Sequence, residues 1–328
     1  MKLNLFSKLI FTAFLAFTLS TFLYFAFGNI YSSKILSYTD FSAQFTSGIY
    51  QYRILSSYFL VWIYEVLSGL NLNYDLFKFK FLNAGSEPQM YLSFYILNTF
   101  FLVLSSVVMT LITETKNFLG TQTEKLLLVC LAVFVLVFSQ FVIVPYDISS
   151  YFFLFLFYFF FLKYLENRST STLLLLALII LISTFNRETS ALSLAVAATL
   201  LYSKFGLKKE TLVPIAVLGI TFLAVYAGLR IFNDALTTND GNLLTENFTQ
   251  PKNLLGLLFW MVFFVLSLIL AKDRKSTRLI ILFHLLSVPY IMMCLYAGIM
   301  YEIRLYIPLF LTSLLLGRTE IRKFNKLT

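Results

Sequence analysis

The chain of 328 residues is 59% hydrophobic and only 12% charged, and it carries a formal net charge of +9. A soluble domain has about 25% charged residues, so this chain has too few polar side chains to cover its apolar mass in water. The composition excludes a soluble enzyme, a disordered chain and a disulfide scaffold. No basic run is interleaved with aromatic residues outside the apolar segments, which excludes nucleic acid as a partner. The positive excess is typical of basic loops that face an anionic cytoplasmic membrane surface.

Apolar segments long enough to cross a bilayer recur along the chain, since a spanning helix needs about 20 apolar residues. The clear candidates are Phe6–Gly28, Met90–Thr113, Lys125–Ile143, Ile148–Leu165, Leu212–Phe232, Leu254–Ala271 and Leu279–Gly298. Three shorter apolar runs are Ser171–Phe185, Ser190–Ser203 and Ile303–Gly317. The first candidate exceeds the apolar core of about 7 to 15 residues of a cleaved signal peptide, so we read it as a retained helix.

The segment Ile54–Leu70 is ambiguous, because it is apolar but contains Glu65 and several serines. If it stays on the outer side while the shorter runs cross, 17 of the 25 basic residues face the cytoplasm. This arrangement satisfies the positive-inside rule. We therefore predict an all-α polytopic membrane protein, a single domain over residues 1–328 with about ten transmembrane helices and both termini in the cytoplasm. Ile54–Leu70 then lies on, or dips into, the outer surface.

This topology leaves two outer loops. The first, Asn29–Gln89, is rich in Tyr and Phe and is predicted to hold two surface helices, of which Asp40–Leu70 is the stronger. The second, Asn233–Asn253, is polar and rich in Gly and Asn. No internal repeat or long linker divides the chain into domains.

Charged residues within apolar spans are costly and usually face a cavity or a partner. Under the predicted topology the most deeply placed charges all lie toward the outer side, which a shared outward cavity would explain. These residues are Asp40, Arg53, Asp147, Arg187, Glu188, Glu302 and Arg304.

The turn Asn186–Thr189 separates two apolar runs of about 15 residues, each about 22 Å long as a helix against a hydrocarbon core of about 30 Å. The turn should sink below the outer surface, where polar backbone needs protein or water around it. Arg187 could bind phosphate through its planar guanidinium, oriented by Glu188. Alternatively, an Arg–Glu pair could hold the two helices together.

A similar arrangement occurs at Tyr301–Pro308, where Glu302 and Arg304 precede another short apolar run. Tyr301 adds a hydroxyl donor and an aromatic face. The alternative is an interfacial aromatic belt with an arginine extended toward the headgroups.

Two aspartates are candidate catalytic groups. Asp147 follows a tight turn and either caps the next helix or lines the cavity. Asp40 either caps a surface helix or acts as a general base toward a sugar or lipid hydroxyl. Arg53, at the start of the surface helix, is either an interfacial anchor or a substrate-binding group.

Four features together resemble the GT-C superfamily of integral-membrane glycosyltransferases, especially its bacterial members. Asp40 lies in a long outer loop after a single span, and a Tyr-Arg-Ile-Leu motif comes next at Tyr52–Leu55. The segment Arg187–Leu192 reads Arg-Glu-Thr-Ser-Ala-Leu, and a late Glu-x-Arg pair occupies Glu302–Arg304.

The resemblance implies transfer of a hexose or pentose from a polyprenyl-phosphate carrier at the outer face of a bacterial inner membrane. Asp40 would activate the acceptor, while Arg187 and Arg304 would neutralise the leaving phosphate. Many members have a paired acidic motif where this chain has Asp40 alone, and many carry a large outer domain. The shorter chain leads us to expect a small acceptor or a partner protein.

Two other functional classes stay open from the sequence. A flippase or polymerase for lipid-linked oligosaccharides would also line an outward cavity with Arg and Tyr, although the polar turns cluster on one side rather than at mid-membrane. A non-catalytic membrane scaffold would use the same charges only for stability. No Asp, Glu or His cluster forms an evident ligand set, so no cofactor is predicted and a divalent metal is left open.

Overall fold

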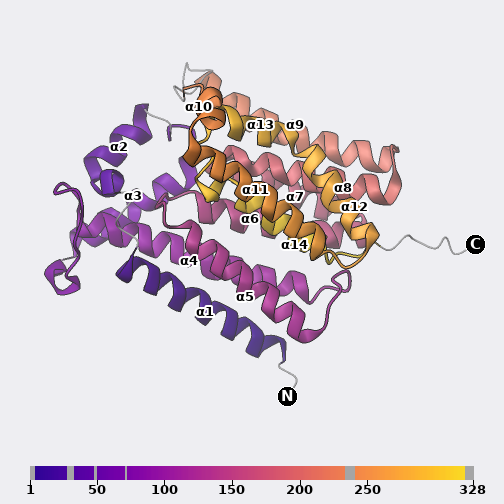
Figure 1. Ribbon diagram of the computed structural model, residues 1–328, viewed down its shortest axis with the longest axis horizontal. Helices are drawn as coiled ribbons and strands as arrows, with labels where there is room; N and C mark the ends of the chain where they lie inside the picture. Colours follow the sequence, from indigo (N-terminus) through magenta and orange to yellow (C-terminus); the bar gives the residue numbers. More distant parts are fainter. Residues whose placement is uncertain (1–3, 28–32, 48–49, 71, 233–240, 322–328) are drawn as a thin grey trace, which may run out of the picture.

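The protein is all-helical in the computed structural model, which describes residues 4–27, 33–47, 50–70, 72–232 and 241–321 (Figure 1). These residues form fourteen α-helices and four short 3-10 helices. One isolated antiparallel bridge pairs Phe118 with Thr319. The predicted all-α class is confirmed. Parts of both predicted outer loops, including residues 233–240, lie outside the described residues.

Six helices of the described chain are long and apolar enough to span a membrane. They are α1 (Leu5–Ala26), α4 (Pro88–Thr113), α5 (Gln122–Ser139), α6 (Asp147–Asn167), α9 (Lys209–Phe232) and α11 (Pro251–Ile269). Shorter helices complete the bundle: α7 (Thr170–Asn186), α8 (Ala191–Phe205), α12 (Arg274–Leu286), α13 (Val288–Ala297) and α14 (Ile307–Leu316). The chain is a multi-pass membrane protein, and lipid is its surrounding partner.

The remaining elements connect the bundle helices. They are η1 (Ser33–Leu36), α2 (Tyr38–Ser47), α3 (Ile54–Gly69), η2 (Tyr74–Phe77), η3 (Glu188–Ser190), α10 (Leu244–Thr249) and η4 (Ile303–Leu305). In Figure 1 helices α2, α3 and α10 lie toward the left-hand end of the bundle.

Two predicted elements are divided in the structure. The predicted span Leu279–Gly298 is the pair α12 and α13, which meet at a bend of 51°. Pro289 in the first turn of α13 has no N–H to continue the α12 hydrogen-bond ladder, which accounts for the break. The predicted surface helix Asp40–Leu70 is the separate helices α2 and α3.

Contacts between turns show that the chain alternates between two ends of the bundle. At one end, the Lys8 ammonium donates to Glu114 at 2.7 Å, which joins α1 to the end of α4. There Leu119 N–H also donates to the carbonyl of Arg318 at 2.7 Å, which joins the start of α5 to the end of α14. At the opposite end, the turns before α6, after α7 and before α14 meet through charged side chains.

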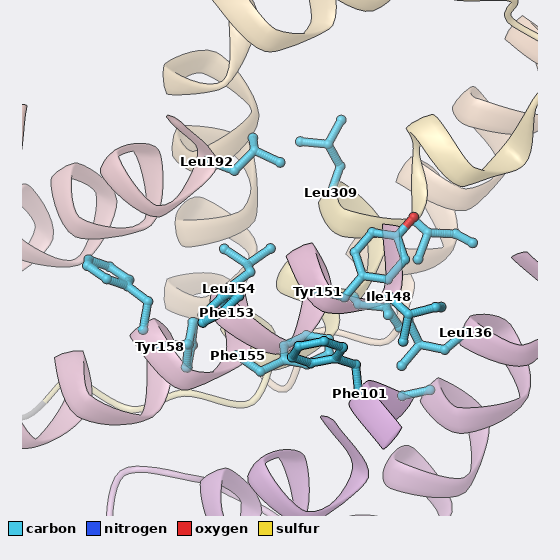
Figure 2. Close-up of a cluster of buried hydrophobic side chains, with 14 of the residues drawn as sticks. Phe101, Leu136, Ile148, Tyr151, Phe153, Leu154, Phe155, Tyr158, Leu192 and Leu309 are labelled. Carbon is cyan, nitrogen blue, oxygen red and sulfur yellow. The ribbon is translucent and has the colours of Figure 1, made fainter. Parts of the chain in front are cut away.

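The core lies where α6 is surrounded by its neighbours, as Figure 2 shows. Buried residues of α6 meet buried residues of α4, α5, α8 and α14; those labelled in the figure are Phe101, Leu136, Ile148, Tyr151, Phe153, Leu154, Phe155, Tyr158, Leu192 and Leu309. Every residue of α14 is buried. Leu305 of η4, directly before this helix, is buried as well.

Candidate functional site

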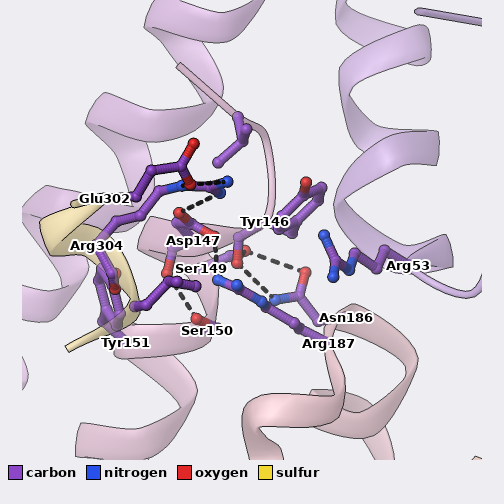
Figure 3. Close-up of polar contacts among 12 residues, drawn as sticks. Arg53, Tyr146, Asp147, Ser149, Ser150, Tyr151, Asn186, Arg187, Glu302 and Arg304 are labelled. Atoms are coloured by element: carbon purple, nitrogen blue, oxygen red, sulfur yellow. Dashed lines mark hydrogen bonds and ion pairs between the residues drawn. The ribbon is translucent and has the colours of Figure 1, made fainter. Parts of the chain in front are cut away.

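Six charged side chains gather at the end of the bundle where the turns before α6 and α14 meet, in two ion-paired groups, and Figure 3 labels five of the six. The network holds three arginines and three carboxylates, so its formal charges balance. Its members are Arg53, Asp147, Arg187, Glu188, Glu302 and Arg304, and we call them the charged network.

Asp147 is the central carboxylate of the charged network. It occupies the first turn of α6 and is only 4% exposed. One of its oxygens pairs with Arg187 Nη1, and the other accepts from Arg304 Nη1 at 3.1 Å. Arg304 in turn donates to Glu302 Oε2 through Nη2 at 2.7 Å and Nε at 2.8 Å. Asp147 therefore joins the turn after α7 to η4 rather than capping its own helix.

Arg53 and Glu188 form the other arm of the charged network. Arg53 is the N-cap residue of α3, and its Nη2 donates to Glu188 Oε1 at 2.8 Å. Its Nε lies 3.4 Å from the second carboxylate oxygen. The expected pairing of Glu188 with its neighbour Arg187 is wrong, because the extended backbone at Arg187 turns the two side chains to different partners.

The ring of Tyr146 connects the two arms. This ring is fully buried. Its centroid lies 4.3 Å from the guanidinium carbon of Arg53 and 5.2 Å from that of Arg187. The ring quadrupole attracts both cations, and this attraction, together with the carboxylate partner of each arginine, offsets the repulsion between them. Tyr146 thus allows two arginines to lie close together at this site.

Neutral polar groups fix the backbone around the charges. Asn186 is fully buried at the end of α7, and its Oδ1 accepts from Ser56 Oγ at 2.5 Å and Ser149 Oγ at 3.0 Å. Its Nδ2 donates to the carbonyl of Tyr146 at 3.2 Å. A buried side chain with three such bonds holds α3, α6 and α7 at a fixed spacing.

Two tyrosine hydroxyls hold η4 against the bundle. Tyr151 of α6 donates to the carbonyl of Arg304 at 2.8 Å, and Tyr290 of α13 donates to the carbonyl of Leu305 at 2.6 Å. The bend between α12 and α13 brings Tyr290 to this position. The Arg304 guanidinium is therefore positioned by its backbone as well as by its ion pairs.

Two of the predicted site residues lie apart from the charged network. Asp40 is exposed on α2, one residue past Thr39, and its backbone N–H donates to Ser37 Oγ at 3.2 Å. It sits inside the first turn of α2, so the expectation that Asp40 caps this helix is wrong. Tyr301 packs under the Lys252 ammonium, 3.8 Å from the ring centroid. In the described chain no ion pair or side-chain hydrogen bond joins Asp40 to the charged network.

Two apolar pockets are lined by residues that are adjacent in sequence to members of the charged network. One, of about 210 Å³, lies among α5, α11, η4 and α14 and is lined by Ile303, Tyr306 and Ile307 next to Arg304. The other, of about 300 Å³, lies between α3 and α7 and is lined by side chains adjacent in sequence to Arg53 and Asn186. Neither is lined by a charged residue.

One donor in the charged network has no partner of its own. The Nε of Arg187 is buried and makes no hydrogen bond within the described residues. A buried guanidinium N–H without an acceptor is costly, and it is a place where an oxyanion could bind. In the same described residues, no group of three or more His, Cys, Asp and Glu side chains could hold a metal ion.

Several contributing residues could not be singled out from sequence. Tyr146 and Asn186 are direct neighbours of predicted charges, and that adjacency is the only signal they carry. Tyr151 lies one helical turn after Asp147 and so shares its face of α6. Tyr290 sits in an apolar helix with no local signal at all, because only the α12–α13 bend makes it a neighbour of η4.

Comparison with known proteins adds no identity. No protein-family model, curated protein or solved structure matches this chain.

The charged network makes a stability prediction at its centre. Asp147→Asn removes the charge shared by Arg187 and Arg304, leaving the buried Arg187 without a carboxylate and Arg304 with Glu302 alone. We expect the variant to lose about 3–5 kcal/mol of unfolding free energy, measured by denaturant unfolding in detergent micelles. The matched control is Asp75→Asn, an exposed carboxylate on η2, which should change stability by no more than about 0.5 kcal/mol. If Asp147→Asn loses no more unfolding free energy than the control, the Asp147 ion pairs contribute nothing to stability.

Proposed function

We propose that the protein is a GT-C-like membrane glycosyltransferase that moves a sugar from a polyprenyl-phosphate carrier to an acceptor at the outer face. The observation that carries the proposal is the meeting of three arginines from three distant turns beside an apolar pocket. A lipid-linked phosphate needs both features, because an apolar pocket binds its chain and cations bind its phosphate.

The carrier would bind with its chain in the pocket among α5, α11 and α14 and its phosphate at Arg304 and Arg187. The free Nε of Arg187 offers one hydrogen bond to a phosphate oxygen. As the bond from the anomeric carbon to the phosphate oxygen breaks, negative charge grows on the leaving phosphate. Each well-placed donor at such a site contributes roughly 10²–10³-fold in rate.

Asp40 is the proposed general base. Both oxygens of Asp147 are occupied by guanidinium groups, and Glu188 and Glu302 are each paired with an arginine. Asp40 is exposed and is engaged by no arginine within the described chain. It can take the proton from the acceptor hydroxyl as that oxygen bonds to the anomeric carbon. Asp147 then orients Arg187 and Arg304.

For topology we propose ten crossings, with both termini in the cytoplasm of a bacterium and the charged network on the outer side of its inner membrane. The six long helices and the α12–α13 pair supply seven crossings, and α7, α8 and α14 supply three more. The alternation of turns between two ends of the bundle supports this count. Lys8, Lys125 and Arg318 form ion pairs at the end opposite the charged network, which agrees with the positive-inside rule.

A membrane scaffold is the second candidate, and one observation favours it. Every arginine of the charged network already has a carboxylate partner, so the network could exist only to hold turns together. A substitution that keeps the charge but changes the shape of the donor group separates the two candidates. It should impair an enzyme that binds phosphate and leave a scaffold intact.

The first activity prediction concerns the guanidinium of Arg187. Arg187→Lys keeps the charge but loses the planar fork and Nε, so we expect release of polyprenyl phosphate from a polyprenyl-phosphate-linked sugar to fall by about 10²-fold. The control is Arg230→Lys, since Arg230 stacks on Tyr226 at 3.6 Å outside the charged network. A fully active Arg187→Lys protein would point to the scaffold.

The second activity prediction concerns Asp40. Asp40→Asn should abolish sugar transfer while leaving the unfolding free energy unchanged, because the side chain is exposed and pairs with no arginine in the described chain. Asp75→Asn, an exposed carboxylate of the same loop, should keep full activity. Transfer is measured with purified protein in nanodiscs. Normal turnover by Asp40→Asn excludes it as the base.

The topology can be tested by labelling in intact cells with a membrane-impermeant maleimide. After Cys130 and Cys294 are replaced by alanine, Asp75→Cys should be labelled from outside and Lys208→Cys only after the membrane is opened. Both positions are exposed, on η2 and in the turn before α9. The reverse pattern would invert the proposed orientation.

A further inference from the structure

The groove between α3 and α7 is distinct from the pocket assigned above to the carrier. It has a volume of about 300 Å³, within the lower range of ligand sites. Its lining side chains are all apolar apart from one tyrosine hydroxyl; they are Ile54, Leu55, Tyr58, Phe59, Ile182 and Phe185. A carbohydrate in this groove would leave most of its hydroxyls without hydrogen-bond partners, which is costly. An alkyl chain has no hydroxyls, so it can fill the groove without this cost.

One end of the groove leads toward the membrane. Tyr58 and Phe59 are 62% and 44% exposed, and they continue the apolar surface that α3 presents outward. Tyr and Trp are enriched at the level of lipid headgroups, and Trp62 on the same helix is also exposed. The groove is therefore open to a chain that is already in the bilayer.

The groove is lined by two close neighbours in sequence of the charged network. Ile54 is the residue directly after Arg53, and Phe185 lies three residues before Glu188. The Arg53–Glu188 pair is thus close along the chain to two residues that line the groove, and the side chains of Arg53 and Glu188 are 13% and 19% exposed. This pair presents both cationic donors and a carboxylate acceptor to a polar headgroup.

The two apolar pockets are lined by sequence neighbours of opposite arms of the charged network. The carrier pocket adjoins Arg304 through Ile303, whereas the α3–α7 groove adjoins Arg53. Tyr146 and Asp147 lie between these arms. A lipid in each pocket would then place its headgroup at the charged network, one at Arg304 and the other at Arg53.

We propose that the α3–α7 groove binds the alkyl chain of the acceptor, which is therefore a membrane lipid with a hydroxyl-bearing headgroup at Arg53 and Glu188. This inference rests on the proposed glycosyltransferase function. The hydroxyl oxygen attacks the anomeric carbon, its proton passes to Asp40, and polyprenyl phosphate leaves with the electron pair. The product is a glycolipid.

The test uses the full chain in nanodiscs of phosphatidylethanolamine and phosphatidylglycerol, with part of the latter carrying a diazirine in its acyl chain. After photolysis, mass spectrometry should find adducts on α3 and α7 lining residues. Ile182→Trp fills the groove and excludes a few methylenes, so adduct yield there should fall about tenfold. Leu178→Trp, on the same helix but exposed and outside the groove, should keep the wild-type yield.

Phe59→Trp provides a second blocking variant with little risk to folding, because Phe59 is already half-exposed at the groove mouth. It should lower the adduct yield in the same direction. Adducts that Ile182→Trp and Phe59→Trp leave unchanged would overturn the proposed groove.

A parallel assay supplies a polyprenyl-phosphate-linked sugar and measures both products. Recovery of the sugar on a lipid that lacks the polyprenyl phosphate, reduced by Phe59→Trp and not by Leu178→Trp, supports the inference. Release of polyprenyl phosphate with the sugar found only on water-soluble acceptors overturns the lipid acceptor and leaves the proposed function intact. Adducts in the groove without any release of polyprenyl phosphate overturn the glycosyltransferase function, and the acceptor role with it.

Discussion

Ionised side chains in an apolar helix bundle must find partners, and this requirement organises one whole end of the molecule. The Asp147 carboxylate can be buried only because two guanidinium groups neutralise it. Those guanidinium groups come from turns that are far apart in the chain. Satisfying one buried charge therefore fixes the positions of α6, η3 and η4 relative to one another, and Arg53 with Glu188 adds the start of α3.

The same constraint leaves the charged network balanced in charge but with one hydrogen-bond donor unused. Three positive and three negative charges balance, so the charged network needs no counterion of its own. The balance is incomplete in detail, because the Nε of Arg187 has no acceptor within the described residues. A phosphate that approaches from the pocket beside Arg304 would complete this hydrogen bonding. Positioned donors that need no reorganisation are what electrostatic stabilisation of a leaving group requires.

Apolar pockets on two sides give the charged network its proposed chemical setting. A single lipid pocket beside arginines would suit binding or transport of one lipid. Two pockets lined by neighbours of different arms of the charged network suit the proposed reaction between two lipids. Helix α3 matters here because it forms a wall of one groove and its N-cap residue is a member of the network.

The sequence by itself determined the membrane class, the position of most helices and the residue types that would be costly to bury. It could do so because apolar length and charge are local properties of the chain. Local pattern also placed Arg53 at the start of a helix. It did not reveal the break at Pro289 or the separation of α2 from α3, since each depends on how a short segment packs.

Only the tertiary structure decided which charges pair. Sequence adjacency suggested Glu188 for Arg187, whereas the fold gives Glu188 to Arg53 and Asp147 to Arg187. It also placed Asp40 outside the network, and it brought in Tyr146, Asn186 and Tyr290. Partner choice depends on distances between turns that lie up to 157 residues apart in the chain. Those distances are set by helix packing, which no local pattern of residues encodes.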